Sequence, residues 1–226
     1  MISKSNIKVD HIKTESGKWK NNVYLVTDTV GGKSVLIDPS WEADKIESAI
    51  NGSGSELSAI LLTHSHWDHV NLVPYFIRKY HVPVFIGENE PTSENLKLFD
   101  IQKVKDGEVL MIGNMEIKTY ETPGHTAGSI CYRIGDFLFT GDTVFIEGCG
   151  ICDSNEDAFK MFESIQRLKK EIPESTMIFP GHTYLCEAGK PMSYLYENNV
   201  YIAFNRSELF VNFRMRSAQK ELFNFK

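Results

Sequence analysis

The sequence predicts an α/β protein with one domain over residues 1–226, in which the functional site lies along the rim of a β-sheet. Short strand-like runs outnumber helical segments, and clustered histidines and aspartates come directly after such runs. A chain of 226 residues is long enough for one sizeable core. The pattern after about residue 190 is mostly helical, so we expect a short helical extension over residues 190–226.

The first half of the chain alternates strand-like and helical segments. The Gly31-Gly32 pair separates two β-type runs and favours a hairpin. The apolar run AILLT is typical of a buried strand and leads directly into His64. The expected elements are strands over Asn22–Thr27 and Ser34–Ile37, a helix over Glu42–Ile50, a strand over Ala59–Thr63, a helix over Leu72–Tyr80 and a strand over Pro83–Ile86.

The second half contains two further hairpin patterns and one long helix. The Gly113-Asn114 and Gly135-Asp136 pairs mark the hairpin turns, and Ser154 with Asp157 resembles a capping box. The expected elements are strands over Glu108–Met111, Met115–Tyr120, Ser129–Ile134 and Phe137–Thr140, a helix over Glu156–Glu171 and a strand over Met177–Phe179. We expect one face of that helix to lie in the core through the stripe Phe159, Phe162, Ile165 and Leu168.

The composition argues against several partners and environments. The net charge of −6 argues against nucleic acid, and no apolar window is long enough for a membrane span. The N-terminus is polar and lysine-rich without the apolar segment of a secretory signal, which predicts a cytoplasmic protein. The spacing of the four cysteines indicates no disulfide framework.

Residues 206–226 are basic although the chain as a whole is acidic. Such a tail could present a cationic patch to an anionic carrier or a phosphate, but a solvated helix face with mixed charges would look the same in the sequence. The surplus of three positive charges comes from Arg206, Arg214, Arg216, Lys220 and Lys226 against Glu208 and Glu221.

The segment Thr63–His69, THSHWDH, has the residue types and spacing of a metal site. His64 and His66 are two residues apart, so their rings point to the same side of an extended segment. Asp68 and His69 follow where the chain turns into a helix, which can direct them to a neighbouring position. The spacing therefore favours two adjacent ions, and imidazole and carboxylate ligands without thiolate favour zinc, iron, manganese or nickel.

Three more candidate ligands each lie in a turn after a strand. His125 in TPGHTAG is flanked by glycines that let the backbone approach closely. Asp142 follows FLFT, and His182 follows MIF in MIFPGH. Each signal is weak alone, but together with the first motif they form an ordered set of seven candidate metal ligands: His64, His66, Asp68, His69, His125, Asp142 and His182.

The chain resembles the metallo-β-lactamase superfamily, and within it the glyoxalase II-like branch. The motifs THSHWDH, TPGHTAGS, FTGDTVF, EGCG and FPGHTY carry the resemblance, which extends from about Asn21 to Tyr201. It implies a four-layer αβ/βα sandwich of two mixed β-sheets, with two metal ions in a groove at one edge. It assigns one ion to His64, His66 and His125, the other to Asp68, His69 and His182, and a bridging position to Asp142.

A narrower resemblance is to the zinc hydrolases encoded with trans-acyltransferase polyketide synthases. It rests on KNNVYLV, DPSW, EGCGICD, the FNFK ending and the overall length. It implies two divalent metal ions, zinc first with iron or manganese as alternatives, and a role in the biosynthesis of polyketide antibiotics.

Two adjacent cations predict a hydrolase that acts on an acyl thioester. Two ions about 3.5–4 Å apart can lower the pKa of a shared water from about 15.7 toward about 7, and the hydroxide would attack a polarised carbonyl. Asp68 and Asp142 are ligands first, and either could also take up a proton. A thiolate leaves readily because the pKa of its conjugate acid is about 8.5. An amine would need a general acid, and the sequence shows no obvious one.

Two departures from glyoxalase II bear on the thiol carrier. That family usually has a basic residue directly after GCG, where it helps to hold glutathione, but this chain has Ile151. The segment after His182 is also short beside the family's glutathione-binding helical domain. An acyl group on phosphopantetheine, carried by an acyl carrier protein or by CoA, fits better. Acyl carrier proteins are typically acidic, so the basic tail offers a docking surface.

Rival functions stay open at this point. They are glyoxalase II itself, a β-lactam or lactone hydrolase, a non-catalytic carrier-binding module, and a persulfide dioxygenase with one iron on the equivalents of His64, His125 and Asp142. Trp67 and Ile151 argue against the dioxygenase, and the complete ligand set argues against a non-catalytic module.

Other conspicuous residues have ordinary interpretations. We interpret the CxxC pattern of Cys149 and Cys152 as part of a glycine-rich loop lining the groove rather than a redox motif. Trp67 is expected to pack under the metal-binding loop, and Tyr184 to be within reach of a substrate.

Overall fold

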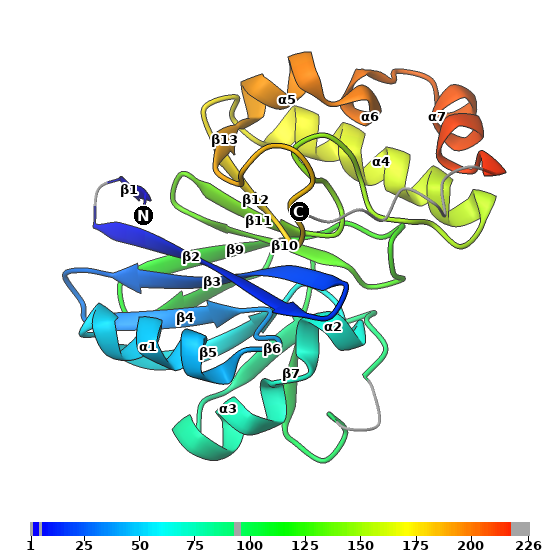
Figure 1. The fold of residues 1–226 in the computed structure, drawn as a ribbon. Helices are drawn as coiled ribbons and strands as arrows, with labels where there is room; N and C mark the ends of the chain where they lie inside the picture. Colours follow the sequence, from blue (N-terminus) through cyan, green and yellow to red (C-terminus); the bar gives the residue numbers. More distant parts are fainter. Residues whose placement is uncertain (1, 5, 93–95, 218–226) are drawn as a thin grey trace.

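The computed structural model describes residues 2–4, 6–92 and 96–217, and two β-sheets dominate them (Figure 1). The first sheet is mixed, with antiparallel pairs from β1 to β4 and parallel pairs from β4 to β7. Its strands lie in chain order: β1 (Ile2–Lys4), β2 (Ile7–Ser16), β3 (Trp19–Asp28), β4 (Lys33–Ile37), β5 (Glu56–Leu62), β6 (Val84–Gly87) and β7 (Ile101–Val104).

The second sheet is antiparallel except for one parallel pair, β11 with β12. Across the sheet the strands are β13 (Lys190–Pro191), β12 (Met177–Pro180), β11 (Phe137–Gly141), β10 (Ile130–Ile134), β9 (Met115–Glu121) and β8 (Val109–Ile112). The parallel pair brings Gly141 beside Pro180, so the turns that follow β11 and β12 start at the same edge.

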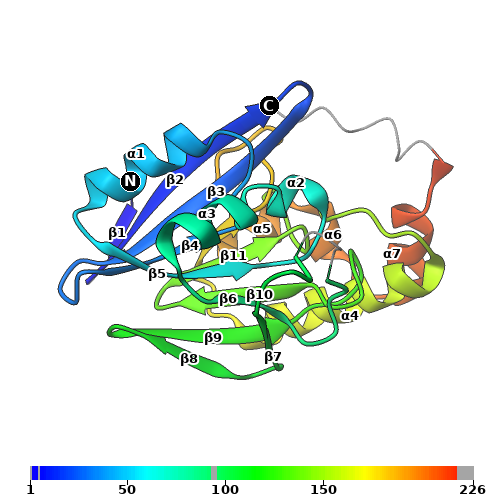
Figure 2. The same ribbon diagram turned by 90° about the horizontal axis from the view of Figure 1, so that it is seen from below.

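The two sheets face each other and helices cover their outer faces (Figures 1 and 2). Helices α1 (Ala43–Ser53) and α3 (Val73–Tyr80) pack on the first sheet through residues such as Ile46 and Phe76. The other sheet is covered by α4 (Asn155–Glu171), α5 (Met192–Asn198), α6 (Val200–Ala203) and α7 (Ser207–Arg214). These layers confirm the predicted four-layer αβ/βα sandwich.

Aromatic side chains fill the core between the sheets. Tyr24 from β3 meets Phe139 and Phe179 from the opposite sheet, with both ring centroids 5.3 Å away. Phe179 also stacks on Phe139 at 5.3 Å and meets Phe137 edge-on at 5.8 Å. The Tyr24 hydroxyl donates to the carbonyl of Pro180 at 2.6 Å, which ties the first sheet to the end of β12. The core therefore extends directly to the segment that carries His182.

The predicted core stripe on α4 is wrong at one position. Phe159 is 43% exposed, and the buried residues of the helix are Ala158, Met161, Ser164, Ile165 and Leu168. The apolar side chains cover about half of the helix circumference, and Phe159 lies at the outer edge of that face, where the second sheet does not cover it. The predicted cap is confirmed, because the Asp157 N–H donates to Ser154 Oγ at 3.1 Å, and the helix begins at Asn155, one residue before the predicted start at Glu156.

Four strands, β1, β2, β7 and β13, were not among the predicted elements. Strand β2 pairs with β3 over ten residues, yet Val9, Ile12 and Thr14 are its only buried side chains from Asn6 onward. Apart from the half-buried Ile7, its other residues are polar or charged and half-buried or exposed, so no apolar run marks it. Within the described residues, no helix is long and apolar enough to cross a membrane.

Candidate metal centre

The structure brings all seven predicted ligands together at one edge of the two sheets. His64 and His66 follow β5, and Asp68 and His69 lie on the short helix α2 (Trp67–Val70), whose N-cap is His66. His125 comes from the loop between β9 and β10, while Asp142 and His182 follow the parallel strands β11 and β12. The Gly181 N–H donates to the Gly141 carbonyl at 2.8 Å, which aligns the last two segments.

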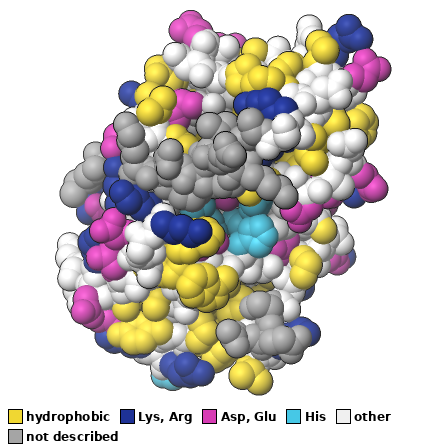
Figure 3. Space-filling view, turned by 45° about the vertical axis from the view of Figure 1, so that its right-hand side comes forward, with side chains coloured by type: hydrophobic (Ala, Val, Ile, Leu, Met, Phe, Trp, Pro, Cys, Tyr) yellow, Lys and Arg dark blue, Asp and Glu magenta, His cyan; other side chains and the backbone are white. Residues whose placement is uncertain are grey.

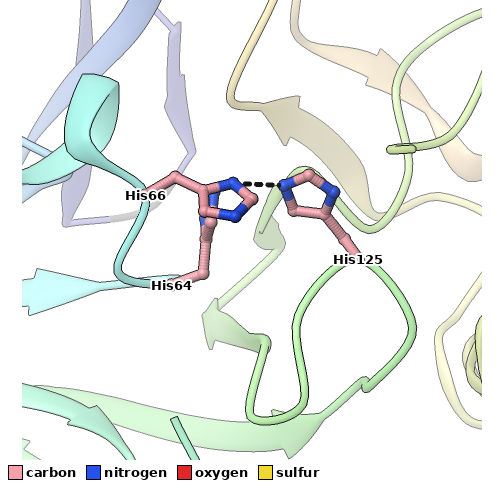
Figure 4. A group of neighbouring side chains, drawn as sticks. All are labelled: His64, His66 and His125. Carbon is pink, nitrogen blue, oxygen red and sulfur yellow. Dashed lines mark hydrogen bonds between the residues drawn. The ribbon is translucent and has the colours of Figure 1, made fainter. Parts of the chain in front are cut away.

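His64, His66 and His125 form one group that could hold a metal ion (Figure 4). The Nδ1 atom of His66 lies 2.9 Å from Nε2 of His125, and the His64 ring lies within 4.8 Å of both rings, centroid to centroid. His64 is fully buried, and its Nε2 atom has no hydrogen-bond partner. Three ring nitrogens therefore face a common point.

Asp68, His69 and His182 form a second group. The Nε2 atoms of His69 and His182 are 3.3 Å apart, and Oδ2 of Asp68 lies 3.6 Å from the first and 3.5 Å from the second. All three residues are buried. Two imidazoles and one carboxylate therefore face a second common point.

Asp142 lies between the two groups. Its Oδ2 atom is 3.5 Å from Nε2 of His125 in the first group and 3.4 Å from Nε2 of His182 in the second. Its Oδ1 atom is 3.5 Å from Nε2 of His69 and has no hydrogen-bond partner. One carboxylate thus reaches donors of both groups, which is the geometry that a bridging ligand requires.

The far nitrogen of three histidines is fixed by hydrogen bonds, so the near nitrogen faces the centre. His125 Nδ1 donates to the Ile151 carbonyl at 2.9 Å, and His182 Nδ1 donates to the Lys20 carbonyl at 2.7 Å. His69 Nδ1 lies 3.1 Å from Oδ2 of Asp38. In each case Nε2 keeps its lone pair for a cation.

Asp38 and Asn21 support the ligands, and sequence reasoning missed both. Asp38 accepts hydrogen bonds from the N–H and Oγ1 of Thr63 at 2.8 and 2.6 Å, besides its contact with His69. Asn21 donates from Nδ2 to Oδ2 of Asp68 at 3.0 Å, and its Oδ1 accepts from the Trp41 indole at 2.7 Å. Both residues lie in quoted stretches, DPSW and KNNVYLV, but their roles depend on contacts between distant segments.

We predict that Asp38→Asn weakens metal binding without removing any ligand. The NH2 group must face either the Thr63 N–H, in place of Oδ1, or His69 and the Thr63 hydroxyl, in place of Oδ2. Either arrangement leaves a donor without an acceptor and weakens the hydrogen-bonded frame that orients the His69 ring. Affinity at the second group should fall by about 10- to 100-fold, as with other partners of metal-binding histidines. Zinc titration followed by calorimetry measures this, and an unchanged affinity would contradict the role given to Asp38.

The electrostatics of the cluster favour a cation. Burial disfavours the charged form of His69, but Asp68, Asp142 and Asp38 outweigh it and raise the pKa of that histidine to about 10. Burial alone would raise the pKa of Asp142, yet His182, His69 and His125 hold it well below its usual range. Burial lowers the pKa of His64 and of His125. Ionised Asp142 and neutral His64 and His125 are therefore in the forms that bind metal, and at His69 a metal ion would replace the proton that the neighbouring carboxylates stabilise.

A further test of the fit is how closely the backbone approaches the centre. A side chain on Gly181 would place its Cβ 2.4 Å from Oδ1 of Asp142 and 2.6 Å from a ring carbon of His69. Only glycine lets the chain pass there. With the unpartnered, buried Nε2 of His64 and Oδ1 of Asp142, the residues present fit two ions held by nitrogen and oxygen donors.

The ligands lie in the wall of a cavity of about 840 Å³. Figure 3 shows histidine side chains in view at the centre of this face, with hydrophobic and basic side chains beside them. Apart from the ligands, the lining is largely apolar and aromatic, through Trp19, Trp67, Phe145, Ile151, Tyr184, Leu185, Val200, Tyr201 and Phe213. Its charged side chains are the cationic Lys18, Arg214 and Arg216 and the anionic Glu147.

Two expectations about the lining have different outcomes. Trp67 does not pack under the metal-binding loop: it is 59% exposed, meets Trp41 edge-on at 4.7 Å and lines the cavity. A tryptophan on the first turn of a short surface helix has too little covering structure to be buried there. Tyr184 does line the cavity, as expected, and burial raises the pKa of its hydroxyl.

The CxxC pattern belongs to the loop beside the centre, as interpreted from the sequence. Cys149 and Cys152 are free thiols, both are buried, and Cys149 lines the cavity. Burial raises the pKa of Cys152 to about 11 and that of Cys149 further. These thiols are therefore protonated at neutral pH and poor nucleophiles.

In the part of the basic tail that the structure describes, residues 206–217, fewer cations lie on the surface than the sequence suggests. Arg214 is buried, and its guanidinium donates to the Tyr201 hydroxyl at 3.0 Å. Arg206 pairs with Glu208 at 2.9 Å, and Arg216 lies on the cavity wall with its guanidinium 3.7 Å from the Phe213 ring centroid. Lys220, Glu221 and Lys226 lie outside the described residues.

Comparison with known proteins agrees with this geometry. The "Probable polyketide biosynthesis zinc-dependent hydrolase BaeB" of Bacillus velezensis is 43% identical over 220 residues, which cover 97% of this chain and 98% of that protein. A hydroxyacylglutathione hydrolase of Hamiltonella defensa is 36% identical over 166 residues, covering 73% and 63%.

A solved metallo-beta-lactamase from Staphylococcus aureus superposes with a TM-score of 0.82 at 22% identity, over 95% of this chain and 68% of that one, which shows the shared fold. Residues 16–182, which include every candidate ligand, match the metallo-beta-lactamase superfamily. The chain belongs to the metallo-beta-lactamase superfamily.

Proposed function

We propose that this chain is a dinuclear metal-dependent hydrolase that cleaves acyl thioesters on a phosphopantetheine arm, in polyketide biosynthesis. The observation that carries the proposal is the position of Asp142, whose carboxylate lies 3.4–3.5 Å from histidine nitrogens of both groups. A single-ion site has no need for a carboxylate shared by two sets of donors. The match to the zinc-dependent hydrolase covers 97% of the chain and supports zinc as the metal.

The seven side chains divide the work between binding and positioning. His64, His66 and His125 would hold one ion, Asp68, His69 and His182 the other, and Asp142 both. Such a pair of ions supplies an acidified water and a Lewis acid for the carbonyl. Asp68, kept in place by Asn21, can also take up a proton as the products separate, whereas the low pKa of Asp142 keeps that carboxylate ionised.

The cavity suits a thioester with a long arm. Its apolar wall, including Phe145 and Leu185, can cover an acyl chain and exclude water, while Lys18 and Arg216 offer positive charge to an anionic arm. Thiolates leave without protonation because the pKa of the conjugate acid is about 8.5. Thioester cleavage therefore requires only the metal centre and a binding surface, and no general acid in the cavity.

Phosphopantetheine is favoured over glutathione by two observations. Ile151 lines the cavity where the glyoxalase II resemblance leads us to expect a basic residue. The hydroxyacylglutathione hydrolase match also leaves about a third of that protein unmatched, whereas the polyketide hydrolase is matched almost completely. We propose an acyl carrier protein or CoA as the carrier, and a cytoplasmic location stays a prediction.

The test compares three substrates on one preparation of the protein that carries the metal it acquired during expression, with the metal content measured on the same sample: acetyl-acyl carrier protein, lactoylglutathione and glutathione persulfide. We expect kcat/KM for the carrier thioester to exceed that for lactoylglutathione by at least about tenfold, the lower end of the discrimination that one lost apolar contact gives. A reversed preference would make the chain a glutathione thioesterase. Oxygen consumption with the persulfide, together with one iron per chain, would instead indicate a dioxygenase.

A further inference from the structure

A buried carboxylate outside the ligand set joins two of the loops that carry ligands. Glu90 lies in the turn after β6 and is 2% exposed. Its Oε1 accepts from the N–H and the Oγ of Ser65 at 2.7 and 2.8 Å. Its Oε2 accepts from Oγ1 of Thr126 at 2.6 Å and from the N–H of Gly128 at 3.1 Å. Both oxygens therefore bind two donors each.

The residues that donate hydrogen bonds to Glu90 are sequence neighbours of the three-histidine group. Ser65 stands between His64 and His66, and Thr126 directly follows His125. These three histidines are the ones that share a common point. Glu90 thus holds both loops that carry the three-histidine group. It does so through neighbouring residues and does not contact the metal-ligating histidines themselves.

The turn of Glu90 and the loop of His125 also meet backbone to backbone. A Cβ on Gly128 would lie 1.9 Å from the Glu90 nitrogen and 2.3 Å from the Asn89 carbonyl carbon. Only glycine fits at that contact. The His125 loop is further tied by the Thr126 N–H, which donates to Ser129 Oγ at 3.1 Å. The carboxylate therefore sits in a fixed frame and is not a mobile surface group.

We propose that Glu90 is a positioning residue that sets the distance between His125 and the His64–His66 pair, and so selectively supports the three-histidine metal site. This inference rests on the metal assignment proposed above. The chemical reason is that all four donors need an acceptor. An ionised carboxylate offers only acceptors, whereas a glutamine must turn its NH2 group toward one loop. Whichever way the amide lies, one backbone N–H of Ser65 or Gly128 loses its partner.

The experiment titrates cobalt(II) into metal-free wild-type, Glu90→Gln and Glu88→Gln proteins, followed by absorption spectra and calorimetry. Glu88 is exposed, two residues away, and makes a 4.0 Å pair with Lys105, so it controls for loss of one charge nearby. In Glu90→Gln we expect the affinity for one of two ions to fall about 10- to 100-fold, with a changed cobalt spectrum. Glu88→Gln should match the wild type within about threefold.

A second set of variants identifies the affected site. In a His66→Ala background, which removes one ligand of the three-histidine group, Glu90→Gln should change the affinity for the remaining ion less than about threefold. Thr126→Val, which removes the hydroxyl, should lose part of the cobalt affinity that Glu90→Gln loses. Thr126→Ser, which keeps the hydroxyl, should bind cobalt like the wild type.

Three results would overturn the inference. They are an unchanged cobalt titration of Glu90→Gln, an equal loss at both ions with a lowered melting temperature of the metal-free protein, and a full effect of Glu90→Gln in the His66→Ala background. If the wild type itself binds fewer than two cobalt ions, the dinuclear assignment fails first, and that result is read before any variant.

Discussion

Asp142→Ala is expected to release metal and abolish hydrolysis together. The Asp142 carboxylate lies 3.4–3.5 Å from nitrogens of His125, His69 and His182. Its loss leaves the two buried sets of metal ligands without a shared negative charge. Loss of a partner that merely orients a ligand costs about 10- to 100-fold, so loss of a bridging ligand should cost more than about 100-fold in kcat/KM. Metal analysis and thioester hydrolysis of the same sample measure both effects.

The matched control for this prediction is Asp136→Ala. Asp136 lies six positions earlier in the chain, exposed in the turn between β10 and β11, and should keep full metal content and activity. Two ions per chain in Asp142→Ala, at wild-type affinity, would remove the bridging assignment and with it the main support for a dinuclear mechanism.

Phe179→Ala should cause the largest loss of stability. Phe179 is 2% exposed and meets Tyr24, Phe137 and Phe139 at ring distances of 5.3–5.8 Å, so it joins the two sheets. Truncating a buried phenylalanine costs about 3–5 kcal/mol of unfolding free energy, from lost apolar burial and from the cavity left behind. Denaturant unfolding of the metal-free protein measures the change.

Phe159→Ala is the matched control, because it is the same substitution on an exposed ring of α4. We expect a change within about 0.5 kcal/mol, the usual range for surface positions. Equal losses at the two positions would contradict the description of the core.

The same variant should also respond less to zinc. Phe179 directly precedes the segment Pro180, Gly181 and His182, and ligand binding stabilises only a formed site. Added zinc should therefore raise the unfolding free energy of Phe179→Ala less than that of the wild type.

The ligand set could be predicted from the sequence because each ligand carries a local signal. His64, His66, Asp68 and His69 are crowded into one short motif, and the other three each follow a short strand in a turn with glycine. The ends of neighbouring strands lie along one edge of a sheet. Residues that follow these ends therefore lie close together, however the side chains in the core are packed. The pattern of strands and helices predicted the α/β class and a site at a sheet rim, and the four layers were implied by the family resemblance alone.

The residues that orient the ligands could not be predicted in this way. Asp38, Asn21 and Glu90 are ordinary polar residues in the sequence, and their roles arise from contacts between segments about 25 to 50 positions apart. Strand β2 escaped prediction because its partner β3, rather than an apolar run of its own, holds it in the sheet. The exposure of Trp67 and Phe159 depends on which neighbours cover them, and a periodic pattern does not contain that information.

The most direct test of the account is the number of metal ions bound per chain after zinc reconstitution, measured by mass spectrometry of the native protein beside its hydrolysis of an acyl-carrier thioester. The account predicts two ions, with activity appearing only as the second site fills. Full activity with a single bound ion would contradict it.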